Sequence, residues 1–171
     1  MNGQDSDRKK ARGYFGIGAE RISKPLNLGN LVRSAHAFGA SFVFTIGAHP
    51  RAFDFFADTS KSQSHMPYYH WASAEEMQLP EDCRLVGIEL LGESEDLPSF
   101  RHPVTAAYVL GPELGALSPE ITRRCDHLVR IPTQFCINVA MAGAIVMYDR
   151  LRTLGRFAPR PLSASPSRRA R

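Results

Sequence analysis

Apolar and polar positions along the chain follow two spacings in turn, and these predict strands and helices. Short apolar runs rich in Val, Ile, Phe and Tyr are typical of buried strands, and they occupy residues 14–19, 41–47, 84–91, 106–111 and 127–131. Helical patterns occupy residues 28–38, 73–78, 118–125 and 138–153. Because the two types alternate, we expect an α/β protein with a mostly parallel sheet and helices on both faces.

Two of these helices carry further information. Ser118 can cap free N–H groups at the start of the third helix, and Pro119 fits its first position. The last helix is apolar nearly all round in its first half, so it must be buried on more than one side. It could lie wholly inside one chain, or between the sheet and a second subunit. We favour the second arrangement, a homodimer.

Composition excludes several classes of protein. The 171 residues, 43% hydrophobic and 22% charged, suit one globular domain. Apolar stretches end well before the ~20 residues that span a bilayer, and the first residues lack the apolar core of a secretory signal, so we expect a cytoplasmic protein that contacts no membrane. Cys83, Cys125 and Cys136 form an odd set without a C-x-x-C pair, which favours reduced thiols. The six histidines lack metal-ligand spacing, and we expect no metal.

Positive charge is concentrated at the two ends, although the net charge is only +4. Residues 1–13 carry four Lys/Arg against two Asp, residues 14–149 ten Lys/Arg against fifteen Asp/Glu, and residues 150–171 seven Arg and no acid. We therefore expect a flexible basic N-terminus at 1–13, a folded domain at 14–154 and a disordered Arg/Pro/Ser-rich tail at 155–171. The tail serves either solubility or the electrostatic tethering of RNA phosphates.

Common nucleotide and hydrolase motifs are absent from the sequence. There is no G-x-x-x-x-G-K-[ST], H-E-x-x-H or G-x-S-x-G, and the lone G-x-G of Gly16 and Gly18 lacks the spacing of a dinucleotide site. Kinases, dinucleotide oxidoreductases and α/β-hydrolases are thereby disfavoured.

Three polar and glycine clusters follow strand ends, where open α/β sheets bind ligands. In the first, PLNLGNLVRSAHAFGA, Asn27 can cap the following helix, and Arg33 can point broadly to the same side. An ordinary capped helix with a solvated Arg explains this cluster equally well. By itself it is a weak signal.

The second and third clusters are more unusual. In VLGPELGALSPE, Gly111 and Gly115 predict a tight loop from which Glu113 projects. In VRIPTQFCINVAMAGAIVMYDR, Asn138 opens the last helix as its cap, and Cys136 is better explained as a buried thiol than as a nucleophile.

Taken in order, the clusters resemble the three motifs of the SpoU/TrmH branch of the SPOUT methyltransferases. These are N-x-G-x-x-x-R, then a strand followed by G-P-E-x-x-G, then I-P followed by a helix that starts x-x-N-V-A. The resemblance covers residues 14–153. It implies a C-terminal trefoil knot, bound S-adenosylmethionine, a homodimer, and methyl transfer to a ribose 2′-hydroxyl of RNA.

The resemblance also assigns site residues. It implies that the catalytic positions are Asn27, Arg33, Glu113 and Asn138, and that the cofactor positions are Leu110, Gly111, Gly115, Ile131 and Ile137. This chain departs from the family at Cys136, where Ser is usual, and in a shorter loop between Ile131 and Asn138. A thiol donates hydrogen bonds less well than a hydroxyl, so catalytic support would shift to Asn138 and Arg33.

Two roles for Arg33 follow from this resemblance. It is either a base, which needs a strongly depressed pKa, or a fork that holds an RNA phosphate and stabilises the developing alkoxide. The fork is the physically easier role. Glu113 and Asn27 would keep Arg33 and the ribose in register.

The substrate is open to more than one interpretation. A small catalytic domain of this kind resembles the enzymes that methylate tRNA at the wobble ribose, so tRNA is favoured over ribosomal RNA. A catalytically silent RNA-binding homologue and a metabolite-binding α/β protein are the alternatives from other classes.

Overall fold

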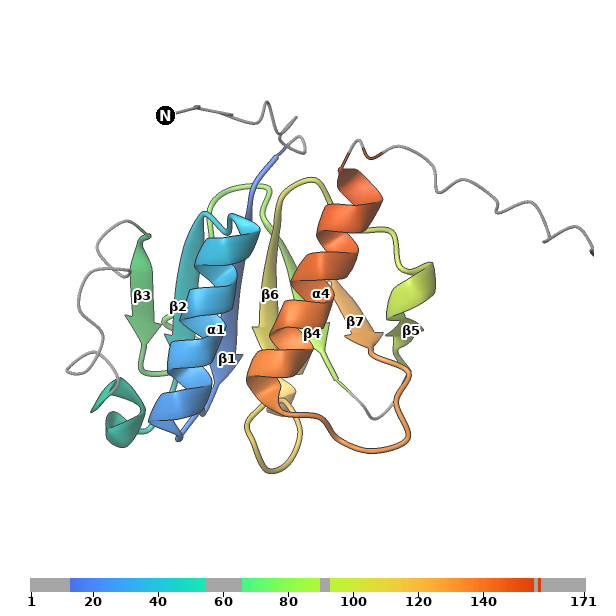
Figure 1. Ribbon diagram of the computed structural model, residues 1–171. Coiled ribbons are helices and arrows are strands. Elements are labelled where there is room, and N and C mark those ends of the chain that lie inside the picture. The colour runs from blue at the N-terminus through green and yellow to red at the C-terminus, as the bar shows by residue number, and fades with distance from the viewer. Residues whose placement is uncertain (1–12, 55–65, 90–92, 156, 158–171) are drawn as a thin grey trace, which may run out of the picture.

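Seven strands form one sheet in which every neighbouring pair is parallel, in the order β3-β2-β1-β6-β4-β7-β5. The computed structural model describes residues 13–54, 66–89, 93–155 and 157. Its strands are β1 (Phe15–Glu20), β2 (Phe42–Ile46), β3 (Tyr68–Trp71), β4 (Arg84–Ile88), β5 (Glu95–Asp96), β6 (Ala106–Leu110) and β7 (His127–Arg130). Figure 1 shows their carboxyl ends at one edge, where the loops after β6 and β7 also lie. The prediction of a parallel α/β sheet is confirmed.

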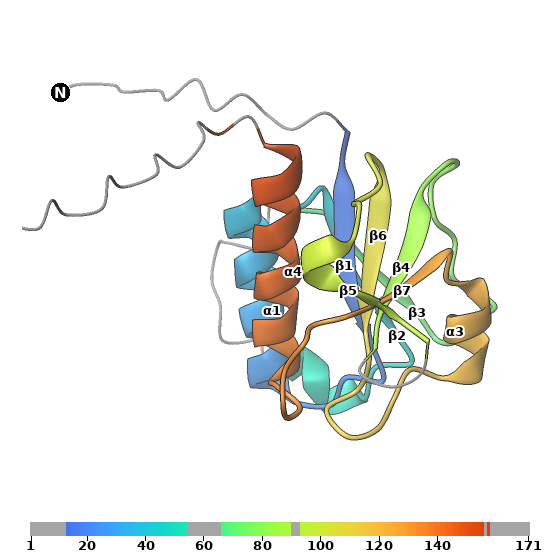
Figure 2. The ribbon, with the colours of Figure 1, turned by 90° about the vertical axis from the view of Figure 1, so that its right-hand side faces the viewer.

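Helices cover both faces of this sheet. The two long ones, α1 (Pro25–Phe38) and α4 (Val139–Leu154), lie side by side on one face, and α3 (Pro119–Arg124) lies on the other (Figure 2). Two short 3₁₀ helices, η1 (Pro50–Asp54) and η2 (Leu97–Ser99), complete the elements. No described helix is long and apolar enough to cross a membrane.

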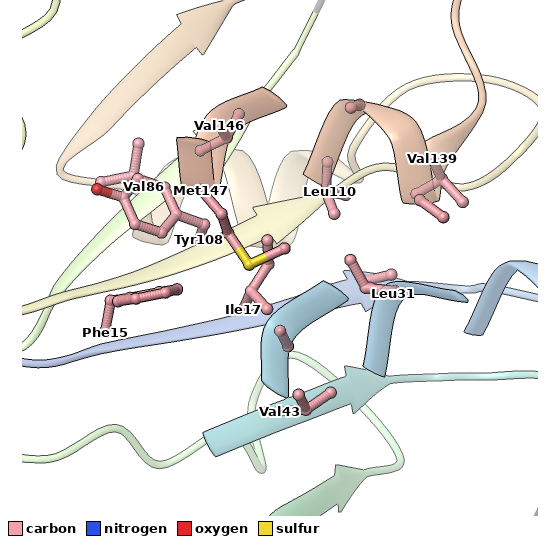
Figure 3. Packing of buried hydrophobic residues seen from close by; sticks show 14 of the residues in the cluster. Phe15, Ile17, Leu31, Val43, Val86, Tyr108, Leu110, Val139, Val146 and Met147 are labelled. Atoms are coloured by element: carbon pink, nitrogen blue, oxygen red, sulfur yellow. The ribbon is translucent and has the colours of Figure 1, made fainter. Parts of the chain in front are cut away.

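The core is divided between the two faces because strand side chains alternate. Ile17, Leu31 and Tyr108 pack with Met147 in the layer under α1 and α4 (Figure 3). On the opposite face, a Cβ added to Gly16 would lie 2.2 Å from the Phe42 ring. The lone G-x-G of β1 therefore makes room for aromatic side chains of β2 rather than for a nucleotide.

The helix starts agree with the sequence in two cases and differ in one. Ser118 Oγ accepts a hydrogen bond from Ile121 N at 3.2 Å, and Asn138 Oδ1 accepts one from Ala140 N at 2.9 Å, so both predicted caps are confirmed. The first helix begins at Pro25, three residues before the predicted start, and its cap position is Lys24. Asn27 lies inside α1, and its predicted role as the cap is wrong.

Other predicted elements also need correction. Residues 73–78 do not form the predicted helix: residues 74–76 make a turn, and Arg124 donates to the carbonyl oxygens of Ala74 and Met77. The strands β3 and β5 were not predicted; they have four and two residues, too short for a clear alternation. The predicted flexible ends, 1–13 and 155–171, lie almost wholly outside the described residues.

Candidate active site

A cavity of about 420 Å³ opens at the carboxyl edge of the sheet. Such a volume lies within the ~300–1,000 Å³ of small-molecule sites. Its wall combines the start of α1, the ends of β4 and β6, and the loop from β7 into α4. All five residues predicted to surround a cofactor line it: Leu110, Gly111, Gly115, Ile131 and Ile137. Three of the four predicted catalytic residues line it as well: Asn27, Glu113 and Asn138.

Glu113 joins the loop after β6 to the start of α1. Its carboxylate accepts hydrogen bonds from the backbone N–H groups of Ser23 and Lys24 at 3.1 and 3.0 Å. The two donors are the cap residue of α1, Lys24, and the residue before it, so Glu113 fixes the backbone that leads into the helix, where a negative charge is favourable. The same carboxylate accepts from Asn27 Nδ2 at 3.1 Å, which fixes the Asn27 amide.

A second bond extends this contact to α4. Asn138 Nδ2 donates to Asn27 Oδ1 at 2.8 Å. Asn138 Oδ1 meanwhile accepts from the backbone of α4, and Asn27 is only 6% exposed. Glu113, Asn27 and Asn138 thus form a relay, called here the Glu–Asn–Asn relay, that connects all three sequence clusters.

Glu113 is ionised at neutral pH. Burial alone would raise the pKa of its carboxyl, but the hydrogen bonds from Asn27, Lys24 and Ser23 outweigh burial and lower that pKa below the ordinary value. A carboxylate held in this way is a weak base, and its geometry suits it to orienting neighbours.

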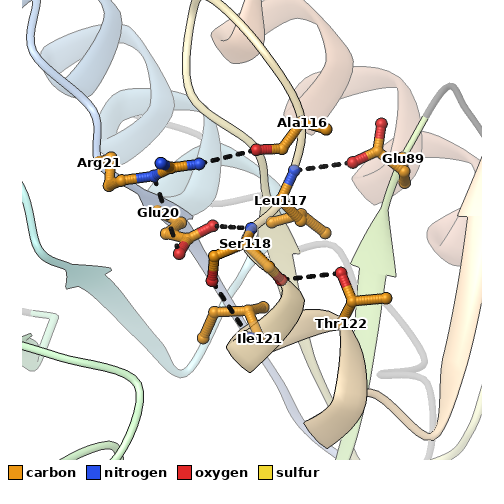
Figure 4. Close-up of polar contacts among 8 residues, drawn as sticks. All are labelled: Glu20, Arg21, Glu89, Ala116, Leu117, Ser118, Ile121 and Thr122. Atoms are coloured by element: carbon orange, nitrogen blue, oxygen red, sulfur yellow. Dashed lines mark hydrogen bonds and ion pairs between the residues drawn. The ribbon is translucent and has the colours of Figure 1, made fainter.

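Side chains at the ends of the two strands that flank β6 hold the loop that carries Glu113 in place (Figure 4). Glu20, the last residue of β1, accepts from Ser118 N at 2.8 Å, and Glu89, just after β4, accepts from Leu117 N at 2.7 Å. Arg21 donates to the carbonyl of Ala116 at 2.8 Å. Three consecutive residues of the loop are therefore fixed from both sides.

Sequence reasoning missed these three side chains. Each stands directly at a strand end on the carboxyl edge, in AER for Glu20 and Arg21 and in GIE for Glu89. That position is the signal that could have found them, because ligands and the loops that hold them gather at this edge. Gly115, by contrast, was predicted as a turn residue, and its φ of 103° requires glycine.

Arg33 is not brought to the cavity of its own chain. It is exposed on α1, whereas Asn27 is buried, so the expectation that the two point to one side is wrong. Six residues at about 100° each place the two side chains about 120° apart around the helix. Arg33 instead shares a helix face with Leu26, seven residues earlier, which is 73% exposed.

Cys136 lines the cavity and is exposed. Its expected role as a buried thiol is therefore wrong. The loop before it is ordered by Thr133, whose hydroxyl donates to the carbonyl of Phe135 at 2.9 Å. Among the described residues, no group of three or more His, Cys, Asp or Glu could hold a metal ion.

The fold and site define a parallel α/β protein whose ligand cavity is closed by the loops after β6 and β7 and bordered by a polar relay. Residues 15–148 match the family described as SpoU rRNA Methylase. The chain belongs to this family.

Two curated relatives and one solved structure illustrate the similarity. The chain is 29% identical over 155 residues to the tRNA (guanosine(18)-2′-O)-methyltransferase TARBP1 of Mus musculus, which covers 78% of this chain and 9% of that protein. It is 30% identical over 176 residues to the 23S rRNA (uridine(2479)-2′-O)-methyltransferase of Streptomyces viridochromogenes, covering 94% and 61% of the two chains. The AdoMet-bound rRNA methyltransferase of Sinorhizobium meliloti superposes with a TM-score of 0.73 at 26% identity, covering 84% and 57%. The chain thus spans less than two thirds of each relative.

Proposed function

We propose that this chain transfers a methyl group from S-adenosylmethionine to a ribose 2′-hydroxyl of RNA. The observation that carries the proposal is the Glu–Asn–Asn relay in the wall of a cavity that the cofactor-binding positions of the family also line. S-adenosylmethionine supplies an electrophilic methyl carbon for in-line attack. The residues of the chain must then align the ribose oxygen and assist the loss of its proton.

The cavity has the chemistry that this cofactor needs. Ile88, Leu110, Ile131 and Ile137 give it an apolar wall for a flat purine ring, and Gly111 and Gly115 allow the loop backbone to come close. The carboxylate of Glu89 and the amide of Asn138 add acceptors and donors for polar groups of the ligand. The trefoil knot that the family resemblance implies belongs to the same proposal, since the two loops that border the cavity would form it.

The relay residues act by position. We assign Asn27 and Asn138 to the orientation of the ribose, because their amides are fixed by each other and by Glu113. A guanidinium is a poor base because its positive charge is delocalised, so Arg33 serves as a fork for an RNA phosphate and for the developing alkoxide.

A homodimer accounts for the position of Arg33. The outer surface of α1 and α4 exposes Leu26, Met141, Ile145 and Tyr148, at 73%, 61%, 38% and 52%. On α4 these residues are spaced i, i+4 and i+7, which makes one apolar stripe. We propose that a second copy of the chain covers this surface. Arg33 then stands at the interface and acts at a site shared by the two subunits.

Transfer RNA in the cytoplasm is the proposed substrate, with the wobble ribose as one candidate position. One curated relative acts on tRNA and supports this choice, whereas the other acts on 23S rRNA and makes ribosomal RNA the second candidate. An assay with radiolabelled S-adenosylmethionine, total tRNA and ribosomal RNA separates the two. Mapping the 2′-O-methyl position then identifies the nucleotide.

Calorimetry tests the proposal against its alternatives. Binding of S-adenosylmethionine and S-adenosylhomocysteine is expected. If neither binds, the chain is a silent RNA-binding homologue. If the affinity for a partner does not depend on salt, the metabolite-binding alternative is favoured, since contacts with RNA phosphates weaken as salt rises.

A further inference from the structure

Positive charges that no acid neutralises gather around the start of α1. In the part of the chain that the structure describes, most Lys and Arg side chains pair with carboxylates or donate to carbonyl oxygens. The exposed ones that do neither are Lys24, Arg33, Arg51 and Arg101. The first is the cap residue of α1, the second lies on α1, and the third lies in η1, which packs against α1. Because residues 14–149 carry more acid than base, this local excess of positive charge points to an anionic partner.

Lys24 and Arg51 lie at one corner of the molecule because the loops after β1 and β2 are joined. His49 N donates to the carbonyl of Ile22 at 2.9 Å, and Figure 1 shows η1 beside the start of α1, on the side away from α4. The Nδ1 atom of His49 accepts from Arg51 N at 3.2 Å, so the neutral ring carries its proton on Nε2, a donor that this exposed side chain can offer to an anion. Lys24, His49 and Arg51 are called here the basic corner. Lys24 also lines the cavity, so the basic corner adjoins the proposed active site.

The other end of the same sheet edge is acidic. Glu93 and Glu95 are exposed beside and within β5, the outermost strand on that side. The arginine of this region, Arg130, is already paired with Asp96. In η1, by contrast, the exposed acid Asp54 is outnumbered by the two cations of the basic corner. A polyanion is therefore attracted to the end of the edge formed by β1 and β2 and repelled from the end formed by β5.

We propose that the basic corner binds backbone phosphates of the substrate RNA, beside the nucleotide that enters the cavity. Guanidinium, ammonium and imidazole N–H groups bind phosphate oxygens without reading sequence. They set the direction of the strand and leave recognition of the nucleotide to the cavity. The RNA then crosses the ends of β1 and β2 and does not cover β5. This inference rests on the proposed function, since it takes RNA as the substrate.

The test is filter binding of total tRNA to the full-length protein, with saturating S-adenosylhomocysteine. Loss of one phosphate contact lowers the slope of log affinity against log salt by about 0.7–0.9, which is about threefold in affinity between 50 and 200 mM salt. Arg51→Gln should therefore bind tRNA about tenfold more weakly than the wild type at the lower salt, and only about threefold more weakly at the higher. Arg51→Lys, which keeps the charge, should recover most of the affinity.

The matched control is Arg101→Gln. It removes an equally unpaired arginine from the segment that leads into β6, at the opposite edge of the sheet, and should keep the wild-type affinity and slope. Glu95→Gln removes a negative charge from the β5 end and should also leave both unchanged. Arg51→Gln should bind S-adenosylhomocysteine as tightly as the wild type, because Arg51 is not in the cavity wall. If Arg51→Gln does not fold, Lys24→Gln gives the same test.

The outcomes separate this inference from the proposed function. Wild-type affinity in Arg51→Gln, an equal loss in Arg101→Gln, or markedly tighter binding in Glu95→Gln overturns the role of the basic corner alone. The expected losses in a protein that methylates neither tRNA nor ribosomal RNA keep the basic corner as an RNA-binding surface and overturn the proposed function. A wild type that binds neither RNA overturns both.

Discussion

Asn138 Nδ2 donates to Asn27 Oδ1 at 2.8 Å across 111 positions of sequence, and the bond joins the starts of α4 and α1. Asn138 uses its other terminal atom, Oδ1, to cap α4. One side chain therefore stabilises a helix and orients a site residue. The two roles can be separated by substitution.

Replacing Asn138 with Ser and with Ala should separate stability from activity. Ser can still cap α4, so Asn138→Ser should retain most of the stability, whereas Asn138→Ala should lose about 1 kcal/mol. Both variants lose the bond to Asn27 and should lose most methylation. Urea denaturation and the radiolabel assay measure the two effects. Full activity in Asn138→Ser would contradict the positioning role of the amide.

Glu113→Gln should lower the free energy of unfolding by an amount that depends on pH. The folded-state pKa of Glu113 is lowered, so its ionised form stabilises the fold at neutral pH, and this contribution is lost as pH falls through the lowered pKa. The difference in unfolding free energy between wild type and Glu113→Gln should therefore be largest near pH 7. It should shrink below about pH 4. A difference that stays constant between pH 7 and pH 3 would mean that charge plays no part in capping α1.

If the chain is a dimer, a charge in the apolar stripe of α4 should halve the mass of the protein in solution. Ile145→Glu places a charge in the apolar stripe of α4 without disturbing the buried face, so it should give a folded monomer in sedimentation equilibrium. The monomer should still bind S-adenosylhomocysteine and lose methylation, because Arg33 would no longer reach the shared site. Arg33→Ala should also lose methylation and keep cofactor binding, yet remain dimeric. An active monomer would contradict the shared site.

The sequence was a good guide wherever the signal is local. Ser118 and Asn138 mark the starts of their helices, and the apolar runs locate the five central strands of the sheet. The start of α1 was missed because Glu113, which accepts from the N–H of the cap residue Lys24, is 89 positions away and invisible to local rules. Pro25 was the local signal for this helix start, because proline is favoured at the first position of a helix.

The structure brings residues of all three motifs to one cavity, whereas Arg33 points away from it. The motifs placed Asn27, Glu113 and Asn138 in one cavity, but a helix turns about 100° per residue, and this carries Arg33 away from Asn27. Glu20 and Glu89 belong to none of the three motifs. Their role comes from the parallel sheet, which sets the ends of β1 and β4 on either side of the loop leaving β6.

A buried network of hydrogen bonds lies beneath α4, and it predicts a pH dependence of stability that does not involve the site. The His102 ring is 3% exposed and lies between Tyr108 Oη at 2.6 Å and Asp149 Oδ2 at 3.0 Å. Arg150 donates to the carbonyl oxygens of Pro103 and Val104 and to Tyr108 Oη. The network therefore connects the last helix to β6 and to the segment before it.

Burial lowers the pKa of His102 below its ordinary 6.5, and the hydrogen bond that the ring donates to Asp149 offsets only part of this. The neutral ring is thus the stable form in the fold, while the unfolded chain takes up a proton near pH 6.5. Stability should be full above about pH 7 and should fall as pH drops from 6.5 through the lowered pKa.

His102→Gln, which can still hydrogen-bond but does not titrate, should show a flatter dependence of unfolding free energy between pH 7 and pH 5. The matched control is His36→Gln, which removes a histidine from the exposed surface of α1 and leaves the buried network intact. Equal slopes in wild type and His102→Gln would mean that the ring does not bear the titration, and that other groups set the stability of the protein in this range.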